Sequence, residues 1–209
     1  MLTTNVRYLK VITFAFAMLS IALASTALAS EPETHDGFML RFVTGLGFQS
    51  TSEDGTGGSV GTSGLSGTTA LALGGVIVPN LAIHGELFLT TITDPTWEVR
   101  LDSGAGVSEE TKGSIVSDGL GVGVTYFMMP LNLYLSGTVG IGKSTAELNN
   151  QSYETDTGFG LNLLVGKEWW VSEEAGIGVA GQLIYVSVPD DSKDLNTVSG
   201  AVLFSVTYN

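Results

Sequence analysis

The chain has 209 residues, no cysteine, and 21 Asp and Glu residues against 8 Lys and Arg residues. The lack of cysteine excludes disulfides and thiolate metal sites, and the formal net charge of −13 argues against nucleic acid or an anionic membrane surface as a partner. Because only 14% of the residues are charged and the mean hydropathy is +0.32, an acidic disordered chain is excluded as well.

Residues 1–29 have the pattern of a secretory signal peptide. Arg7 and Lys10 form a basic start, residues 11–24 form an apolar run, and Ala27-Leu28-Ala29 is a small-x-small cleavage site. A helical membrane anchor is the alternative, but the apolar run is shorter than the roughly 20 residues that such a helix needs. The sequence therefore predicts an exported protein.

The rest of the chain predicts a short segment at residues 30–36 and one all-β domain over residues 37–209. Apolar residues alternate with small or polar residues in eight segments, with the period of two that is typical of strands with two different faces. The segments cover approximately residues 37–49, 67–78, 82–92, 113–128, 132–146, 158–170, 176–188 and 197–209. An aliphatic face opposite a small and polar face is the pattern of a membrane β-barrel with a narrow polar lumen.

The connections between these segments alternate in length. Short turns are expected at residues 79–81, 129–131 and 171–174, and long loops at residues 50–66, 93–112, 147–156 and 188–196. All five prolines lie ahead of the first segment or in these connections, as expected because proline cannot donate to a strand ladder. The predicted fold is an eight-stranded antiparallel transmembrane β-barrel with short periplasmic turns and long external loops.

Aromatic residues gather beside the short turns. Tyr126 precedes the second turn, Trp169 and Trp170 precede the third, and Tyr208 lies at the end of the last segment. Aromatic rings concentrate at membrane–water interfaces, so these four residues are predicted to form an interfacial girdle at the periplasmic rim. Glycines recur on the predicted inner face, where they are expected to make room for larger neighbours in a narrow barrel.

The alternation, the unequal connections and the C-terminal Phe204-Ser205-Val206-Thr207-Tyr208-Asn209 together resemble the small outer-membrane β-barrel family, which includes OmpA-type transmembrane domains and OmpX-like barrels. The resemblance covers about residues 37–209. It implies the outer membrane, contact with outer-membrane lipid and lipopolysaccharide, and recognition of the C-terminal strand by the barrel-assembly machinery. Family members usually end on an aromatic residue, whereas here the last aromatic residue is penultimate. No cofactor is implied.

Four ionisable residues fall on the inner face by the same alternation. Arg41, His84, Glu86 and Glu168 each lie a few residues from the periplasmic end of their segments. Buried charges need partners, so the sequence predicts a polar network in the lumen centred on Arg41, with Glu86 or Glu168 and with His84 nearby. The network is interpreted as a plug that rigidifies the lumen, and the alternative is a gate or a proton path.

The two histidines argue against catalysis. Barrel hydrolases need a histidine within reach of a serine or an aspartate near the outer leaflet, whereas His35 precedes the first segment and His84 lies near the periplasmic end. We therefore predict that the protein is not an enzyme.

Acidic residues gather in the predicted external loops. They are Glu53, Asp54, Asp94, Glu98, Asp102, Glu109, Glu110, Glu147, Glu154, Asp156, Asp190, Asp191 and Asp194. A solvated surface is the simplest interpretation, and divalent cations bridging carboxylates to lipopolysaccharide are the alternative.

The sequence predicts a structural or surface-interaction role for an outer-membrane barrel that displays acidic loops. One alternative is a narrow channel for small solutes. The other is a soluble lipocalin-like barrel, which would bind an apolar ligand and would carry the aliphatic face on the inside.

Overall fold

The computed structural model describes residues 34–55, 58–101, 106–148, 151–190 and 193–209. The predicted signal peptide lies outside the described residues, as does most of the segment at residues 30–36. In the described part of the chain, no helix has the length and apolar character needed to span a membrane.

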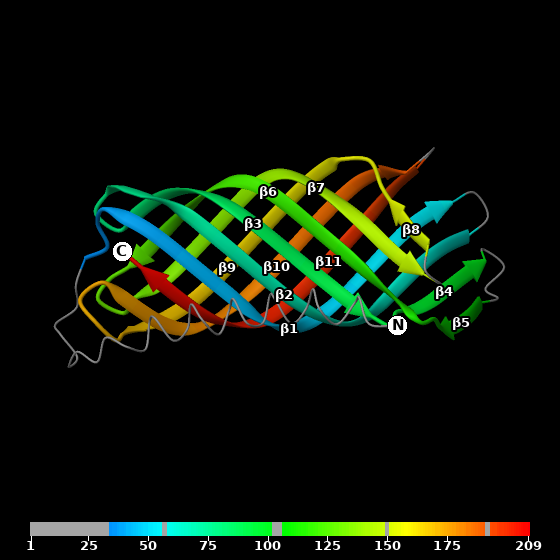
Figure 1. Ribbon diagram of the computed structural model, residues 1–209, viewed down its shortest axis with the longest axis horizontal. Helices are drawn as coiled ribbons and strands as arrows, with labels where there is room; N and C mark the ends of the chain where they lie inside the picture. The colour runs from blue at the N-terminus through cyan, green and yellow to red at the C-terminus, as the bar shows by residue number, and fades with distance from the viewer. Residues whose placement is uncertain (1–33, 56–57, 102–105, 149–150, 191–192) are drawn as a thin grey trace.

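Eight long strands form a closed antiparallel ring, in which each strand pairs with the next and the last pairs with the first (Figure 1). In ring order they are β1 (Phe38–Gly55), β2 (Gly58–Val78), β3 (Leu81–Thr93), β6 (Gly113–Met128), β7 (Leu133–Leu148), β9 (Gly158–Trp170), β10 (Ala175–Asp190) and β11 (Lys193–Tyr208). Closure by the β1–β11 pair removes the open edges that an antiparallel sheet would otherwise leave. The predicted eight-stranded antiparallel barrel is confirmed.

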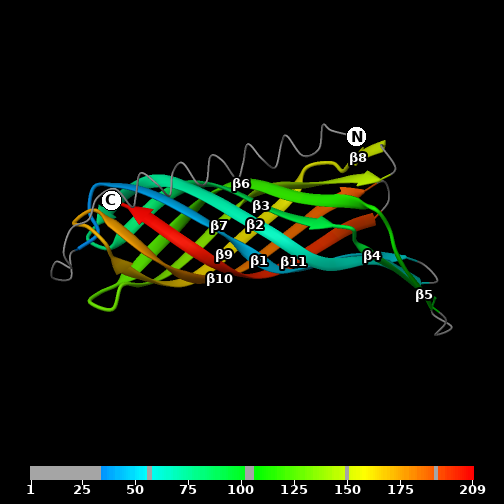
Figure 2. The ribbon, with the colours of Figure 1, turned by 60° about the horizontal axis from the view of Figure 1, so that its bottom comes forward.

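The two ends of the barrel differ. One end, here called the turn end, carries the short turns β2–β3, β6–β7 and β9–β10 and the C-terminal residues. The other, here called the extended end, carries the far parts of the long hairpins together with three short strands: β4 (Thr96–Leu101), β5 (Gly106–Glu110) and β8 (Gln151–Glu154). Figure 2 shows β4 and β5 projecting beyond the wall of the barrel at this end.

All four predicted long loops consist largely of strands instead, with β4 and β5 in residues 93–112 and β8 in residues 147–156. Residues 50–55 continue β1, residues 58–66 begin β2, and the two pair with each other up to Gly55 and Gly58. Residues 188–190 and 193–196 likewise extend the β10–β11 hairpin. The β1–β2 stretches are rich in Ser, Thr and Gly, and the β10–β11 stretches carry Pro189 and charged residues. None of them has apolar alternation, but a strand ladder is formed by backbone groups and needs no apolar face.

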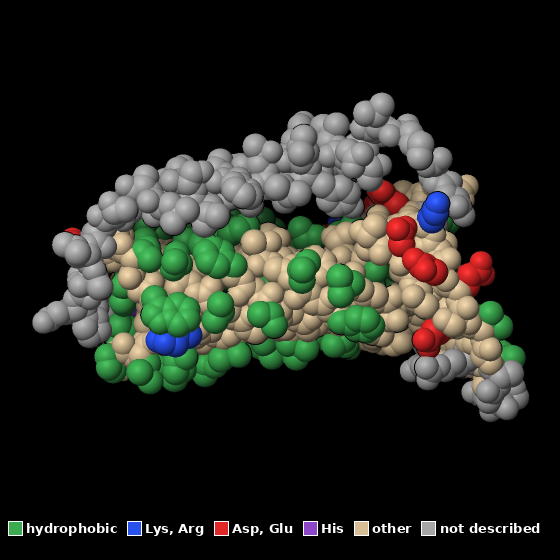
Figure 3. Space-filling view, turned by 90° about the horizontal axis from the view of Figure 1, so that it is seen from below, with side chains coloured by type: hydrophobic (Ala, Val, Ile, Leu, Met, Phe, Trp, Pro, Cys, Tyr) green, Lys and Arg blue, Asp and Glu red, His purple; other side chains and the backbone are tan. Residues whose placement is uncertain are grey.

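The wall has the two faces that the alternation predicts. Large aliphatic and aromatic side chains point outward and stay exposed, for example Leu46 at 67%, Val122 at 68% and Val202 at 73%. Figure 3 shows hydrophobic side chains along the wall and acidic side chains gathered at the extended end. A soluble protein rarely exposes an apolar surface of this extent.

The interior is filled by side chains of mixed character. Buried polar residues lie toward both ends, for example Thr207 near the turn end and Thr51 near the extended end. An apolar cluster is also enclosed, and it includes Val43, Phe88, Ile184, Val186 and Leu203. The predicted polar lumen is therefore only partly correct, because large apolar residues alternate into the interior where glycines face them. A Cβ atom at Gly119 would lie 2.3 Å from the Phe88 ring, and one at Gly166 would lie 2.4 Å from the Tyr134 ring. The predicted role of the inner glycines is confirmed at these two positions.

Candidate functional site

The four predicted lumen residues are all buried on the inner face. Arg41 lies on β1, His84 and Glu86 lie on β3, and Glu168 lies on β9, each near the turn end. The strand period of two places each of them inward, because their sequence neighbours point to the outer face.

Arg41 contacts side chains on the opposite wall. Its Nη2 donates a hydrogen bond to Ser136 Oγ at 2.7 Å, and its guanidinium lies 4.8 Å from the centre of the Tyr134 ring. Thr125 Oγ1 donates to the same Ser136 oxygen at 2.9 Å and lies 3.0 Å from His84 Nε2. One polar chain therefore crosses the lumen from β1 to β7, β6 and β3.

Hydroxyl groups rather than Arg41 are the hydrogen-bond partners of Glu168, and they bind only one of its two oxygens, since Oε2 is buried without a partner among the described residues. Glu168 Oε1 accepts hydrogen bonds from Ser205 Oγ at 2.6 Å and from Thr207 Oγ1 at 2.7 Å. Tyr134 donates to the same Ser205 hydroxyl at 3.1 Å, which links Glu168 to the ring below Arg41.

Glu86 is held by a second set of partners. It accepts hydrogen bonds from Thr138 and from Asn162 Nδ2, the latter at 3.2 Å. Gln182 donates to Asn162 at 2.9 Å, and Thr68 donates to Gln182 at 2.9 Å. This second run of hydrogen bonds therefore connects β3, β9, β10 and β2. Within the described residues, no ion pair joins Arg41 directly to a carboxylate, and hydroxyl and amide groups are the hydrogen-bond partners of both glutamates.

Sequence alternation alone does not identify the hydroxyl and amide partners. Ser136, Thr125, Asn162 and Gln182 all fall on the inner face by alternation, and that was the available signal. Which of them meet across the lumen depends on the stagger of the strands, which a single strand's pattern does not contain.

His35 closes the turn end. Its ring stacks on Phe127 with centroids 3.5 Å apart and lies 4.8 Å from the Trp170 ring. Its Nε2 lies 2.9 Å from Asn132 Oδ1, and its backbone N–H donates to Asn80 Oδ1 at 3.1 Å. Burial among these rings lowers the pKa of His35 from its ordinary value. The hydrogen bond to Asn132 opposes this shift, and the Arg41 charge adds to it. The neutral imidazole is thus the form that fits the closed end.

Asn80 and Asn132 hold His35 from two different turns. Both residues have a positive φ, of 67° and 48°, a conformation that asparagine tolerates better than most residues. From sequence alone, His35 is only a poor catalytic candidate, because its burial depends on two turns that are distant in the sequence.

Three of the four predicted interfacial aromatics face outward. Tyr126, Trp169 and Tyr208 are about half exposed at the turn end, and Lys167 lies 5.3 Å from the centre of the Trp169 ring. The prediction is wrong for Trp170, whose ring lies against His35 at the turn end of the barrel. Consecutive strand residues point to opposite faces, so Trp169 and Trp170 cannot both face outward.

The acidic residues lie mainly at the extended end. Glu109, Glu110, Glu147 and Glu154 are exposed there, while Asp102 and Asp191 lie outside the described residues. Among the described residues, no group of three His, Asp or Glu side chains is arranged to hold a metal ion.

Comparison with known proteins gives a fold but no sequence family. No protein-family model and no curated protein matches the chain. Neisserial surface protein A is similar in structure, with a TM-score of 0.50, 14% identity, and coverage of 84% of this chain and 98% of that one. This chain has the fold of the small outer-membrane β-barrels.

Two other solved structures are similar at lower TM-scores. OprG from Pseudomonas aeruginosa matches with a TM-score of 0.49 and 11% identity over 84% of this chain and 98% of that one. The outer-membrane protease OmpT from Escherichia coli matches with a TM-score of 0.42 and 9% identity over 88% of this chain and 99% of that one. The fold assignment rests on the Neisserial protein.

Proposed function

We propose that the protein is an integral outer-membrane barrel, exported through its leader, with a structural or surface-interaction role and no catalytic activity. The observation that carries the proposal is the belt of exposed aliphatic side chains around a closed antiparallel ring. Such a belt is stable in lipid and costly in water. The soluble lipocalin-like alternative needs these residues inside.

The orientation follows from the two ends. In outer-membrane barrels the short turns face the periplasm and the long connections face outward. The turn end, with Tyr126, Trp169 and Tyr208, then meets the periplasmic interface, and the acidic extended end is displayed outside the cell. Outer-membrane lipid and lipopolysaccharide are the proposed surroundings of the wall, and β11 is the proposed signal to the barrel-assembly machinery.

Side-chain packing argues against the channel alternative. Two runs of side-chain hydrogen bonds cross the lumen, and Phe88, Tyr134 and Arg41 are fully buried within it. Reconstituted protein in planar bilayers is therefore expected to show no conductance steps. Steps that change in an Arg41→Ala, Glu86→Ala variant would favour a gated channel instead.

Cysteine labelling tests the location and the orientation together, because the chain has no native cysteine. Thr157→Cys places a thiol in the exposed connection before β9, and Glu173→Cys places one in the exposed β9–β10 turn. A membrane-impermeant maleimide is expected to label the first on intact cells and the second only after the outer membrane is permeabilised. The reverse pattern would contradict the orientation, and recovery in the soluble periplasmic fraction would contradict the membrane assignment.

A further inference from the structure

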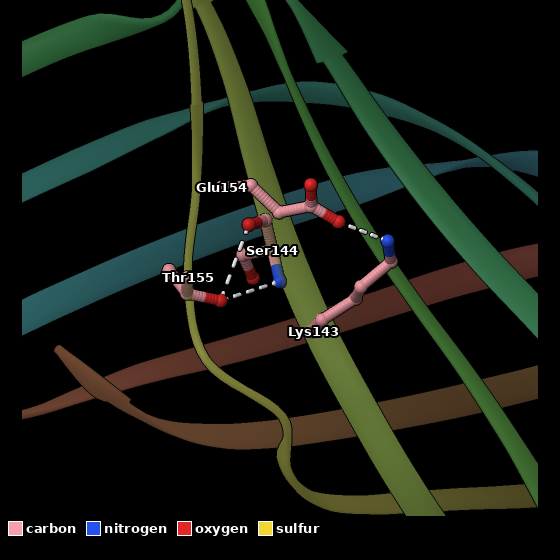
Figure 4. Close-up of polar contacts among 4 residues, drawn as sticks. All are labelled: Lys143, Ser144, Glu154 and Thr155. Atoms are coloured by element: carbon pink, nitrogen blue, oxygen red, sulfur yellow. Dashed lines mark hydrogen bonds and ion pairs between the residues drawn. The ribbon is translucent and has the colours of Figure 1, made fainter.

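Two lysines, Lys143 and Lys167, lie on the outer face of the barrel wall, toward opposite ends. Lys143, on β7 near the extended end, is ion-paired with Glu154 (Figure 4). The segment that carries Glu154 is fixed to β7, because the Ser144 backbone N–H donates to Thr155 Oγ1 at 3.0 Å and that hydroxyl donates to the Ser144 carbonyl at 3.2 Å. The charge of Lys143 is therefore neutralised within the chain.

Lys167, on β9 near the turn end, has a different environment. Its Nζ donates to the Leu131 carbonyl in the β6–β7 turn and lies 5.3 Å from the centre of the Trp169 ring. Among the described residues, no carboxylate forms an ion pair with it. A lysine ammonium group has three N–H donors, so two remain for an acceptor outside the chain. The positive charge of Lys167 is thus presented at the wall.

An apolar hollow opens in the wall beside Lys167. Its volume is about 610 Å³, and its lining includes outward-facing residues of three neighbouring strands: Leu135 and Gly137 of β7, Leu163 and Val165 of β9, and Gly181 and Leu183 of β10. The four aliphatic side chains among them are 41–54% exposed. Val165 and Lys167 share the outer face of β9 and lie roughly 7 Å apart along the strand. The hollow therefore begins next to the lysine and continues toward the extended end.

Two glycines give the hollow its depth. Gly137 pairs with Leu163 and Gly181 pairs with Val165, so each leaves a gap beside a large neighbour. An added Cβ would come no closer than 3.4 Å to Leu163 at the first position and 3.7 Å to Val165 at the second. These are ordinary contact distances, so neither glycine is needed for close packing of the barrel. A larger side chain at either position would occupy the hollow and leave the strands in place.

We propose that this face binds one zwitterionic glycerophospholipid, with its phosphate on Lys167 and one acyl chain in the hollow. Basic groups beside apolar membrane surfaces bind lipid headgroups. The order along the wall matches such a lipid, because Trp169 marks the interface, Lys167 follows, and the hollow lies deeper in the belt. Glu173 and Glu174 are exposed in the β9–β10 turn and are not ion-paired among the described residues, so they favour an ammonium group beyond the phosphate.

This inference rests on the proposed membrane location and orientation. It deepens them by assigning a lipid class and a binding site to one side of the wall, where the proposed function gives only general lipid surroundings.

Native mass spectrometry of the refolded, full-length mature protein in detergent micelles counts the bound lipids. The three probes carry the same two acyl chains: a phosphatidylethanolamine, a phosphatidylglycerol and a diacylglycerol without a phosphate. We expect one phosphatidylethanolamine to stay bound at the collision energy that removes the detergent. Phosphatidylglycerol should bind about fivefold more weakly, and the diacylglycerol should not be retained.

Matched variants test the headgroup contact. Lys167→Gln is expected to weaken binding of phosphatidylethanolamine about fivefold, and Lys167→Arg is expected to retain it. Lys143→Gln removes an equal charge from the other end of the outer face and should change nothing, because that lysine is paired with Glu154.

A second pair of variants tests the hollow. Gly181→Leu fills it and is expected to abolish retention of the lipid. Gly85→Leu is the control, because Gly85 faces outward on β3, away from the hollow, and an added Cβ there lies 4.0 Å from its nearest atom. This control should bind the lipid as the parent does.

No retained lipid, equal retention of the diacylglycerol, or equal effects of Lys167→Gln and Lys143→Gln would overturn the inference. Phosphatidylglycerol bound as tightly as phosphatidylethanolamine would overturn the zwitterionic class. A heat-dependent electrophoretic shift, recorded for each variant, shows that the barrel is intact, so these results would leave the proposed function standing. A protein that stays soluble without detergent and lacks the shift would contradict the proposed function itself.

Discussion

At the scale of single residues, buried charge is the feature that most constrains the interior. Arg41 is almost completely buried, and its nearest partners are the neutral hydroxyl of Ser136 and the Tyr134 ring. Removing it takes a cation out of an interior that also buries Glu86 and Glu168, and breaking such a buried set of ionisable groups is costly in a medium of low polarity.

Arg41→Ala is therefore expected to lower the free energy of unfolding by about 3 kcal/mol. Urea unfolding in phospholipid vesicles, followed by tryptophan fluorescence, measures this change. Lys112→Ala, an exposed cation at the extended end, is the matched control and is expected to have little effect. A change below about 0.5 kcal/mol for Arg41→Ala would show that the charge does not support the fold.

His35 gives the turn end a defined pH dependence. Burial holds its pKa below the ordinary value of about 6.5, so the unfolded chain takes up a proton at a higher pH than the folded one. This contribution to stability is complete above the ordinary pKa and is lost as the pH falls below it. Stability should therefore fall between about pH 7.5 and about pH 5.5, and His35→Gln should lose less over the same interval. Identical pH profiles for the two proteins would contradict the burial of a neutral His35.

At the scale of elements, the inner glycines set how closely large side chains pack against facing strands. Gly166 on β9 faces the phenol of Tyr134 on β7. The Tyr134 hydroxyl donates to Ser205, and the Arg41 guanidinium lies over the Tyr134 ring. Gly166→Ala would push this ring away from both contacts. We expect a loss of about 2 kcal/mol from such overpacking.

Gly85→Ala is the control for this substitution. Gly85 faces outward on β3, and the nearest atom to an added Cβ lies 4.0 Å away. Its stability should stay within about 0.5 kcal/mol of the parent, because alanine fits an open strand position. Equal losses in the two variants would show that the effect comes from replacing glycine in a strand rather than from Tyr134.

The alternation of the sequence predicted the elements better than it predicted their ends. All eight ring strands and their inner and outer faces follow from apolar periodicity, because lipid requires an apolar outer face. The outer parts of β1, β2, β10 and β11 lie beyond that requirement, so residues without an apolar period form strands there. The same limit applies to the site: alternation placed Arg41 and Glu168 inside, while their partners depend on the stagger between strands.

At the scale of the whole molecule, the outward belt is the property that decides where the protein resides. Val122 lies on β6 between Gly85 of β3 and Val139 of β7, and its side chain is 68% exposed. Val122→Arg places a charge on this face, and in vesicles it should destabilise the barrel by about 2–4 kcal/mol.

Ser152→Arg on β8 is the comparison for this variant. Ser152 is exposed at the extended end, beyond the aliphatic belt, so an arginine there stays in water and should cost little. Equal tolerance of both substitutions would contradict contact between β6 and lipid.

The central claim is that the aliphatic face of the closed ring meets the membrane. Electrophoresis of outer-membrane fractions in SDS, with and without boiling, tests it most directly, since a closed membrane barrel stays folded in the detergent until it is heated. We expect a band in the outer-membrane fraction whose mobility changes on boiling. A soluble periplasmic protein whose mobility is the same before and after boiling would contradict it.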